Sequence, residues 1–353
     1  MADFLQNEPL LITKLHSPQP RPHLVERRRL LDLLDRSLAE RRLTLIAAPA
    51  GYGKTTLVSA WLHGLDTGRR GMRPGPDPAD TANTEFLQET RCLPAVAWLA
   101  LDEDDNDPAR FFLYLVGGLR TVCPGIGAAT LDLVASPHGA AAAALVTPLI
   151  NELAGQPRRV LVVLDDYHVI QSPPIHAALD FLCRHAPPNL HLVLLTRADP
   201  PLAIATLRAR GLLAELRTHD LRFTAEEARA FFAAALPAPV AAEAVDVLSA
   251  RTEGWAAGLQ LAALALEGCD AAEAAAFAAS FHGSDRYIMD YLVEQVLQRL
   301  PADLRSFLCR IAILERMCAP LCDALTGRED SSVLLAEIDA ANLFLVRLDR
   351  KGE

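Results

Sequence analysis

The chain of 353 residues predicts an α/β protein in which helices cover both faces of a parallel sheet, followed by a helical half. Two observations lead to this fold class. Up to about residue 220, short and continuous apolar runs alternate with helical stretches, which is typical of parallel strands buried on both faces. From Phe223 onward the apolar period becomes helical, and no convincing strand follows for roughly 115 residues.

Five apolar runs are the predicted strands, and each is short and bounded by proline, glycine or charged residues. They are residues 43–47, 95–101, 160–164, 190–196 and the weaker 212–216. Between the first two strands, residues 64–94 are rich in proline and glycine and show little periodicity. We expect this span to be a flexible surface insertion.

The helical half opens on a capping box, in which Thr224 is the N-cap and Glu227 follows three residues later. Proline and glycine breaks divide the rest of this half into two small units. The last apolar run, NLFLVRLDR at 342–350, resembles a strand without a pairing partner, so we expect the last unit to be truncated. The predicted domains are an α/β domain at 1–222, a small helical domain at 223–283 and a third domain at 284–353.

Composition excludes several classes of protein. With 34 Lys+Arg and 44 Asp+Glu the formal charge is −10, which argues against a self-sufficient nucleic-acid binder. Hydrophobic residues make up 51% and charged residues 22%, so the chain is not disordered. Seven cysteines without a CxxC pair support neither a disulfide framework nor a zinc ribbon. With no signal peptide or long apolar run, a cytoplasmic protein without membrane contact is predicted.

The strongest chemical signal is the segment APAGYGKTT at residues 48–56, which we call the phosphate loop. In such loops, backbone N–H groups at a helix N-terminus cradle phosphates, a lysine neutralises the β and γ oxygens, and the next hydroxyl ligates Mg²⁺. By this logic Lys54 is the phosphate lysine and Thr55 is the magnesium ligand. The hydroxyl of Thr56 would reach the α-phosphate.

The spacing of glycines departs from the strict motif, because Ala48 stands where its first glycine is expected. Gly51 supplies the backbone freedom three residues later, and Gly53 permits the turn before the lysine. The alternative interpretation is a glycine-rich helix entry with an exposed lysine. A strand before the loop and a helix after it favour phosphate binding.

An acidic pair provides the groups that a phosphate loop needs for hydrolysis. Asp165 and Asp166 follow a buried strand, at the edge where open α/β sheets bind ligands. Asp165 would hold Mg²⁺ through water, and Asp166 would polarise the nucleophilic water. A helix-capping role for the pair is the alternative. At the end of the next strand, Arg197 would sense the γ-phosphate, since a planar bidentate donor suits phosphate oxygens, unless it is a surface arginine.

With these motifs placed, the sequence resembles the MalT-like STAND ATPases, the nucleotide-switch core of large LuxR-type bacterial transcription regulators. The resemblance runs from about residue 11 to residue 348, apart from the insertion. Besides PAGYGKTTL it rests on rarer strings, among them LVVLDDYHVI, LLTRADPPLAIATLRARG and TEGWAAGLQLAAL.

The resemblance also implies roles for single residues. Arg27, in the element Val25-Glu26-Arg27, would lie near the nucleotide, and Asp165 and Asp166 match the family's Walker B pair. Arg197 matches its sensor arginine.

The resemblance extends to a G-x-P element of the helical domain, whose proline packs on the adenine in many relatives. Gly254 and Trp255 match its first two positions, but Ala256 replaces the proline. We expect Trp255 to be a core residue, with a role as nucleotide ligand as the alternative.

The family's architecture would make the third domain an incomplete winged helix. Its switch logic implies ATP, ADP and Mg²⁺ as cofactors, self-association in the ATP state, a closed ADP state and an inducer whose identity the sequence does not reveal. Relatives continue with a superhelical sensor and a helix-turn-helix. Neither is found in these residues, so no DNA-binding domain is assigned to the chain.

Three functions remain open. The first is a signalling switch with slow Mg-dependent ATP hydrolysis, in which domain rearrangement is the output. The second is a phosphotransferase or remodelling ATPase with its own substrate, which would need a substrate pocket or an arginine-bearing lid. The third is a truncated fragment that binds nucleotide without switching.

Some other polar clusters receive structural interpretations. The acidic run 102–107 lacks the glycine and closing glutamate of a calcium loop, and we expect it to cap the following helix. His168 is expected to cap or pack, with a general-base role as the alternative. Cys318 and Cys322 are expected in the core.

Overall fold

The computed structural model describes residues 10–20, 24–67, 93–136, 141–236, 240–281, 293, 297–314 and 317–340. The chain divides into two compact units. The first, the sheet unit, comprises residues 1–47, 54–196 and 200–217. The second, the helical unit, comprises residues 48–53, 197–199 and 218–353.

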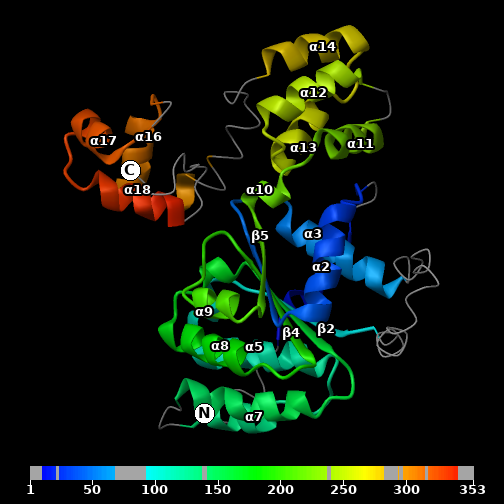
Figure 1. Ribbon diagram of the computed structural model, residues 1–353, viewed down its shortest axis with the longest axis vertical. Helices are drawn as coiled ribbons and strands as arrows, with labels where there is room; N and C mark the ends of the chain where they lie inside the picture. Colours follow the sequence, from blue (N-terminus) through cyan, green and yellow to red (C-terminus); the bar gives the residue numbers. More distant parts are fainter. Residues whose placement is uncertain are drawn as a thin grey trace. The chain divides into compact units, whose positions relative to one another are not determined.

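The sheet unit contains five parallel strands in the order β2-β3-β4-β1-β5 (Figure 1). Their bounds are β1 Leu43–Ala47, β2 Ala95–Ala100, β3 Val160–Asp165, β4 Leu190–Thr196 and β5 Leu213–Arg217. Each predicted strand is present, with ends that differ by no more than one residue. The predicted fold class is confirmed.

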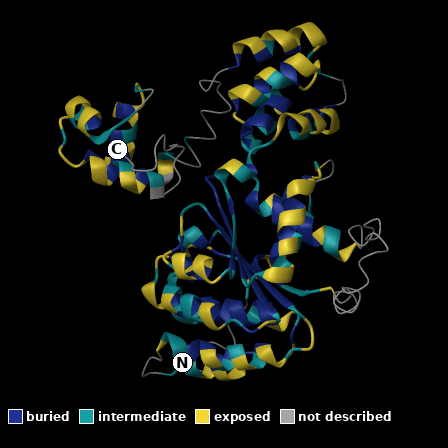
Figure 2. Cartoon of the chain, viewed as in Figure 1, coloured by how far each residue is buried: buried dark blue, intermediate teal, exposed yellow. Residues whose placement is uncertain are grey.

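The register aligns the carboxyl ends of the three central strands. Ala47 of β1 lies opposite Thr196 of β4, and Leu164 of β3 lies opposite Leu194. Residues that follow β1, β4 and β3 therefore leave the sheet at the same edge. All three strands are buried along their full length (Figure 2), which explains why they appear in the sequence as unbroken apolar runs.

Helices cover both faces of this sheet. On one face, Ser37 of α2 (Arg28–Glu40) contacts Thr44 of β1, with 2.6 Å between their hydroxyl oxygens. On the other face, the odd-numbered residues of β1 and even-numbered residues of β3 and β4 join one core with α5, α7 and α8. These helices are α5 Pro108–Arg120, α7 Ala142–Ala154 and α8 Pro173–His185, and the unit also contains α6 Ala128–Val134 and α9 Ile204–Ala209.

The segment that precedes α2 is anchored by a buried ionic cluster. Lys14, in the short helix η1 (Ile12–Leu15), donates to Asp102 at 2.9 Å and to the fully buried Asp105 at 2.5 Å. Arg110 lies 3.4 Å from Asp105, and the ammonium of Lys14 lies 4.4 Å from the centre of the Tyr114 ring. The sequence patterns did not indicate this cluster.

The acidic run caps the following helix, as we expected, and it also caps a short helix of its own. Asp107 caps α5 by accepting from the backbone N–H of Arg110 at 2.9 Å, so that prediction is confirmed. Asp102 forms a capping box with Asp105 around the short helix η3 (Glu103–Asn106). Earlier in the chain, α3 (Lys54–Asp66) continues past the predicted start of the insertion at residue 64, and residues 68–92 lie outside the described part.

In the helical unit, all regular elements among the described residues are helices. The first group is α10 Thr218–Leu221, α11 Ala225–Ala235, α12 Ala242–Arg251, α13 Ala256–Ala265 and α14 Ala271–Ser280. The predicted capping box is confirmed, because Glu227 N–H donates to Thr224 Oγ1 at 3.1 Å and Thr224 N–H donates to Glu227 Oε2 at 3.2 Å.

A second group of helices has its own apolar core. It comprises η5 Leu297–Arg299, α16 Ala302–Ile311, α17 Ala319–Thr326 and α18 Ser331–Ala340. The core is formed by Leu304, Phe307, Ile311, Cys322, Leu334 and Ile338. Cys322 is fully buried, as predicted, whereas Cys318 is only half-buried. The predicted strand at 342–350 lies outside the described residues.

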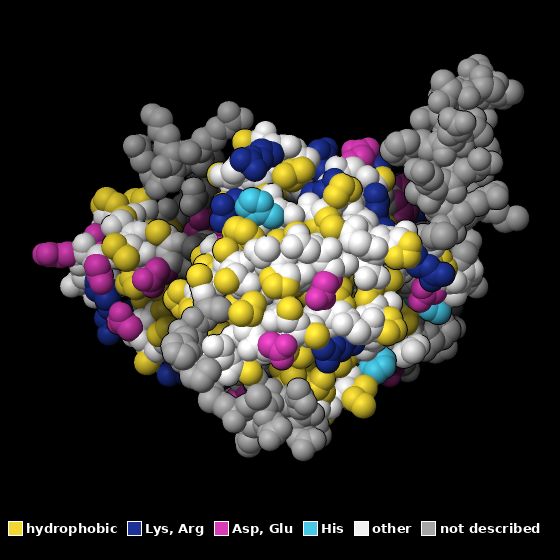
Figure 3. Space-filling model, turned by 90° about the horizontal axis from the view of Figure 1, so that it is seen from below, with side chains coloured by type: hydrophobic (Ala, Val, Ile, Leu, Met, Phe, Trp, Pro, Cys, Tyr) yellow, Lys and Arg dark blue, Asp and Glu magenta, His cyan; other side chains and the backbone are white. Residues whose placement is uncertain are grey.

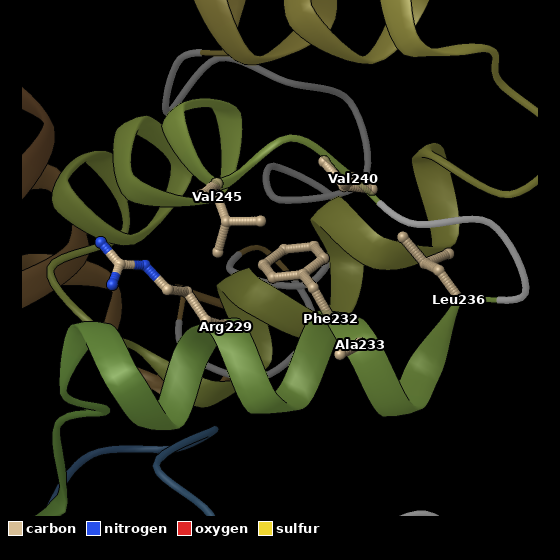
Figure 4. A pocket seen from close by; sticks show the side chains of 7 residues that line it. Arg229, Phe232, Ala233, Leu236, Val240 and Val245 are labelled. Atoms are coloured by element: carbon tan, nitrogen blue, oxygen red, sulfur yellow. The ribbon is translucent and has the colours of Figure 1, made fainter.

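A hollow of about 290 Å³ lies between α11 and α12 (Figure 4). Its walls are apolar, with Phe232 and Val245 on opposite sides, and Arg229 is the charged residue among the described residues that line it. Arg229 forms an ion pair with Asp246 at 2.6 Å.

The surface is mixed in charge. On the face seen in Figure 3, acidic and basic side chains lie scattered among hydrophobic and uncharged ones. Within the described part of the chain, no helix is both long enough and apolar enough to cross a membrane.

Candidate nucleotide-binding site

The first part of the site is the turn between β1 and α3. β1 ends at Ala47 and α3 begins at Lys54. Between them, Gly51 and Gly53 adopt φ angles of 81° and 74°, a region that side-chain-bearing residues rarely enter. At both positions that the sequence analysis identified, the backbone therefore has the positive φ angle that favours glycine. A glycine-rich loop entering a helix N-terminus is a general anion-binding arrangement.

The first turn of α3 carries the three polar side chains of the predicted motif. Lys54, its first residue, is buried, Thr55 is half-buried and Thr56 is exposed. The hydroxyl of Thr55 donates to both oxygens of Asp165, at 3.1 and 3.0 Å. The fold therefore brings together the predicted hydroxyl and carboxylate ligands of a metal ion, although they lie far apart in the sequence.

Asp165 is the last residue of β3 and is almost entirely buried. Burial raises the pKa of its carboxyl to about 6, and the negative charge of Asp166 adds to the increase. The hydrogen bond from Thr55 and the positive charge of Lys54 act in the opposite direction. A buried carboxylate beside a hydroxyl is an oxygen donor set that suits a hard divalent cation, so the residues present fit Mg²⁺.

Asp166 has a left-handed backbone, with φ 55° and ψ 36°. For a residue with a side chain this conformation costs about 1–2 kcal/mol, and aspartate and asparagine tolerate it best. The Asp166 N–H donates to Asp165 Oδ1 at 3.0 Å, and its own side chain is half exposed. The turn thus directs one carboxylate toward Thr55 and leaves the other accessible to water.

His168 lies next to this pair, in the short helix η4 (Tyr167–Val169). Its Nδ1 is 3.7 Å from Asp166 Oδ1, and its side chain is 17% exposed. It packs beside the acidic pair, as expected.

The two predicted arginines occupy different parts of the fold. Arg27 is buried at the N-cap of α2, where its carbonyl accepts from the Leu30 N–H at 2.9 Å. Arg197 is half-buried and directly follows Thr196, the buried end of β4. Their contacts with a nucleotide stay predictions, as does the contact of Thr56.

Contacts that sequence reasoning missed hold the phosphate loop within the helical unit. The indole N–H of Trp255 donates to the carbonyl of Ala50 at 3.1 Å. The backbone N–H of Ala257 donates to the carbonyl of Gly51 at 2.9 Å. Trp255 is buried, as predicted, but it also binds the loop backbone, a role that the sequence did not indicate.

The turn before Trp255 is tightly constrained. Gly254 has φ 69°, and a Cβ atom there would lie 2.5 Å from the carbonyl oxygen of Phe223. Its carbonyl accepts from the Phe223 N–H at 2.8 Å. Arg222 pairs with Glu253 at 2.8 Å, and burial raises the pKa of the nearby Tyr52 hydroxyl. Only glycine fits at position 254, which accounts for the glycine that precedes Trp255.

Comparisons with known proteins agree with this geometry. Residues 25–195 match the AAA ATPase domain and residues 293–353 match the MalT winged helix domain. The HTH-type transcriptional regulator MalT of Cronobacter sakazakii is 37% identical over 346 residues, and that of Serratia proteamaculans is 36% identical. Each alignment covers 98% of this chain and 35% of the relative.

The same fold occurs in the Walker-type ATPase of Pyrococcus abyssi, with a TM-score of 0.57 and 16% identity. That superposition covers 96% of this chain and 95% of the archaeal one. The chain spans about a third of the length of the curated relatives that it matches. By its sequence identity to these relatives and its two domain matches, the chain is a homologue of MalT-like transcriptional regulators over about a third of their length, with an AAA ATPase domain and a MalT winged helix domain.

Proposed function

We propose that this chain is the nucleotide-dependent switch of a MalT-like regulator, which binds ATP or ADP with Mg²⁺ and hydrolyses ATP slowly. The observation that carries the proposal is the pairing of Thr55 with Asp165, at 3.0 and 3.1 Å, beside the helix N-terminus that follows the phosphate loop. In P-loop NTPases a hydroxyl and a strand-end aspartate in this relation hold the magnesium ion of the bound nucleotide.

Binding would depend on the loop and on Lys54. The positive φ angles of Gly51 and Gly53 shape the loop, and the buried ammonium of Lys54 at the start of α3 provides the positive charge for the β and γ oxygens. Thr56 and Arg27 are the further contacts that we propose for the nucleotide. Bound magnesium would offset the negative charge of the phosphates and favour the ionised form of Asp165.

Hydrolysis would depend on Asp166. Its half-exposed carboxylate can accept a proton from water or orient it toward the terminal phosphate. Arg197, at the end of the neighbouring strand β4, would respond to that phosphate. Because the output would be a change in domain arrangement, one slow turnover per signalling event is sufficient.

The wider biology follows from the relatives and is part of the proposal. The curated relatives are named HTH-type transcriptional regulators. We propose a cytoplasmic protein with domains at 1–222, 223–283 and 284–353, which self-associates in its ATP state in response to an inducer. Free cysteines at all six described positions suit a reducing compartment.

The test uses the purified chain and its Lys54→Ala variant. We expect the wild type to retain ADP or ATP, released on denaturation, and Lys54→Ala to retain none. Arg210→Ala is the control, because it removes the same charge from an exposed side chain of the sheet unit. Equal nucleotide retention by the wild type and Lys54→Ala would sink the proposal.

Two alternatives make different kinetic predictions. A phosphotransferase or remodelling ATPase would turn over ATP faster than about 1 s⁻¹ without an inducer. A non-switching fragment would bind ATP and ADP but show the same hydrogen exchange in the helical unit with either nucleotide. The switch predicts slow turnover and exchange that differs between the two nucleotides.

A further inference from the structure

We propose that Trp255 and the first turn of α13 are a positioning element for the phosphate loop, so that nucleotide affinity depends on the contact between α13 and the loop. The inference rests on the proposed nucleotide binding and goes beyond it, because it assigns a role to residues that touch neither phosphate nor metal.

Two carbonyl groups of the loop are bound by the start of α13. The Ala50 carbonyl accepts from the Trp255 indole at 3.1 Å, and the Gly51 carbonyl accepts from the Ala257 N–H at 2.9 Å. Both acceptors therefore face α13. In a planar trans peptide the N–H points opposite to the carbonyl that it shares a plane with. The N–H groups of Gly51 and Tyr52 are consequently directed away from α13.

Those two N–H groups have the character of a ligand site. Within the described part of the chain, neither the Gly51 nor the Tyr52 N–H has a hydrogen-bond acceptor. Successive N–H groups turned the same way form the concave nest that binds anions. The two hydrogen bonds from α13 therefore orient the backbone donors that a phosphate would use.

The donors on α13 are themselves held in place. Gly254 is packed against Phe223 so closely that no Cβ fits, and this fixes the chain direction into Trp255. On the loop, the Tyr52 side chain is buried, and Arg222 pairs with Glu253 just before Trp255. The start of α13 thus contacts the loop through two backbone carbonyls.

This arrangement couples binding to the helical unit. If contact with α13 favours the loop conformation that binds phosphate, bound nucleotide must favour that contact by the same factor. Bound nucleotide would therefore strengthen the contact between the loop and the start of α13.

The central test is Trp255→Phe, which keeps an aromatic ring but removes the indole donor. We expect its Kd for fluorescently labelled ADP to rise about threefold to tenfold, the range of one neutral hydrogen bond. Trp61→Phe is the matched control, since it removes another buried indole donor, to Asp35 at 2.7 Å, in the sheet unit. It should destabilise the fold but leave the Kd within twofold. A purely structural role for Trp255 would lower the melting temperature and leave the Kd of the folded protein unchanged.

Ala257→Pro tests the second contact without depending on Trp255. Proline at this position removes the N–H that binds Gly51, while the first turn of a helix tolerates proline, as α8 does at Pro173 and Pro174. We expect a loss of ADP affinity of at least tenfold. Glu243→Pro, at the equivalent position of α12, is the control and should bind ADP like the wild type.

The outcomes separate this inference from the function on which it rests. If Lys54→Ala abolishes ADP binding but Trp255→Phe and Ala257→Pro bind ADP as tightly as the wild type, the positioning role is refuted and the proposed function stands. If Lys54→Ala binds ADP normally, the proposed function fails first. Weaker binding by both α13 variants, with normal binding by both controls, supports the inference.

Discussion

Replacing Asp165 with asparagine is expected to stabilise the nucleotide-free protein at neutral and alkaline pH while weakening its binding of Mg²⁺ and nucleotide. The carboxyl is buried at the end of β3, and its pKa is raised from 3.8 to about 6. A difference of this size between the native and unfolded states corresponds to about 3 kcal/mol. Asparagine avoids this penalty because it carries no charge to bury.

The sign of the pH dependence follows from proton binding. Between pH 3.8 and about 6 the native state holds the Asp165 proton more often than the unfolded state does. The free energy of unfolding therefore falls as pH rises through that window and stays low above it. Relative to the wild type, Asp165→Asn should gain about 2–3 kcal/mol at pH 8 and only about 0.5 kcal/mol at pH 4.

The assay is urea unfolding of nucleotide-free protein at both pH values, followed by tryptophan fluorescence. Two of the three tryptophans, Trp61 and Trp98, are buried in the sheet unit and report on its unfolding. Asp132→Asn, at an exposed carboxylate in α6, is the control and should change stability by less than about 0.5 kcal/mol. A variant no more stable than the wild type at pH 8 would refute the assignment of Asp165 as a destabilising buried charge.

Three further substitutions test the proposed catalytic role of Asp166, the start of α13 and the buried ionic cluster. Asp166→Asn should lower the single-turnover rate of ATP hydrolysis at least 100-fold, because asparagine accepts protons poorly. The affinity for ADP should not change, because asparagine tolerates the left-handed backbone. Retained hydrolysis would exclude Asp166 from catalysis. Ala256→Pro should stabilise the protein by about 0.4–1 kcal/mol, since Trp255 before it is extended and α13 begins at this residue; a lower melting temperature would contradict this. Lys14→Met should cost about 3 kcal/mol in urea unfolding by leaving Asp105 buried without its ammonium partner, and adding Asp105→Asn should recover part of the loss.

The fold could be predicted because its signals are local. Each strand is a short, largely apolar run close to a proline, glycine or charged residue, so a short window of sequence contains both the strand and its limits. The same holds for the Thr224 and Glu227 capping box, where residues three apart satisfy each other's backbone. Parallel topology then placed the phosphate loop and the acidic pair at one edge of the sheet, which made the contact between Thr55 and Asp165 foreseeable.

The contacts that escaped prediction join residues distant in the sequence. Lys14 and Asp105 are 91 residues apart, and no periodicity links one lysine to one member of an acidic run. The bond from Trp255 to Ala50 joins residues 205 apart and ends on a backbone carbonyl, a group that every residue carries. Sequence patterns identify side-chain types, so a contact whose acceptor is main chain leaves no compositional trace. Gly254 was the only local sign, because its backbone conformation excludes other residues.

Two features of the candidate site destabilise the folded protein, and both lie where a bound cation and nucleotide would contact it. Asp165 is a buried carboxyl with a raised pKa, and Asp166 has a left-handed backbone. Elsewhere in the sheet, His191 is buried and its pKa is lowered to about 4. The contribution of His191 to the free energy of unfolding therefore falls as pH decreases, over the range in which the contribution of Asp165 rises. The two contributions oppose each other in the wild type, and only Asp165 lies where a metal would bind. A bound cation would relieve the cost of burying the Asp165 charge, and it would shift a domain equilibrium only by as much as it binds one arrangement more tightly than the other.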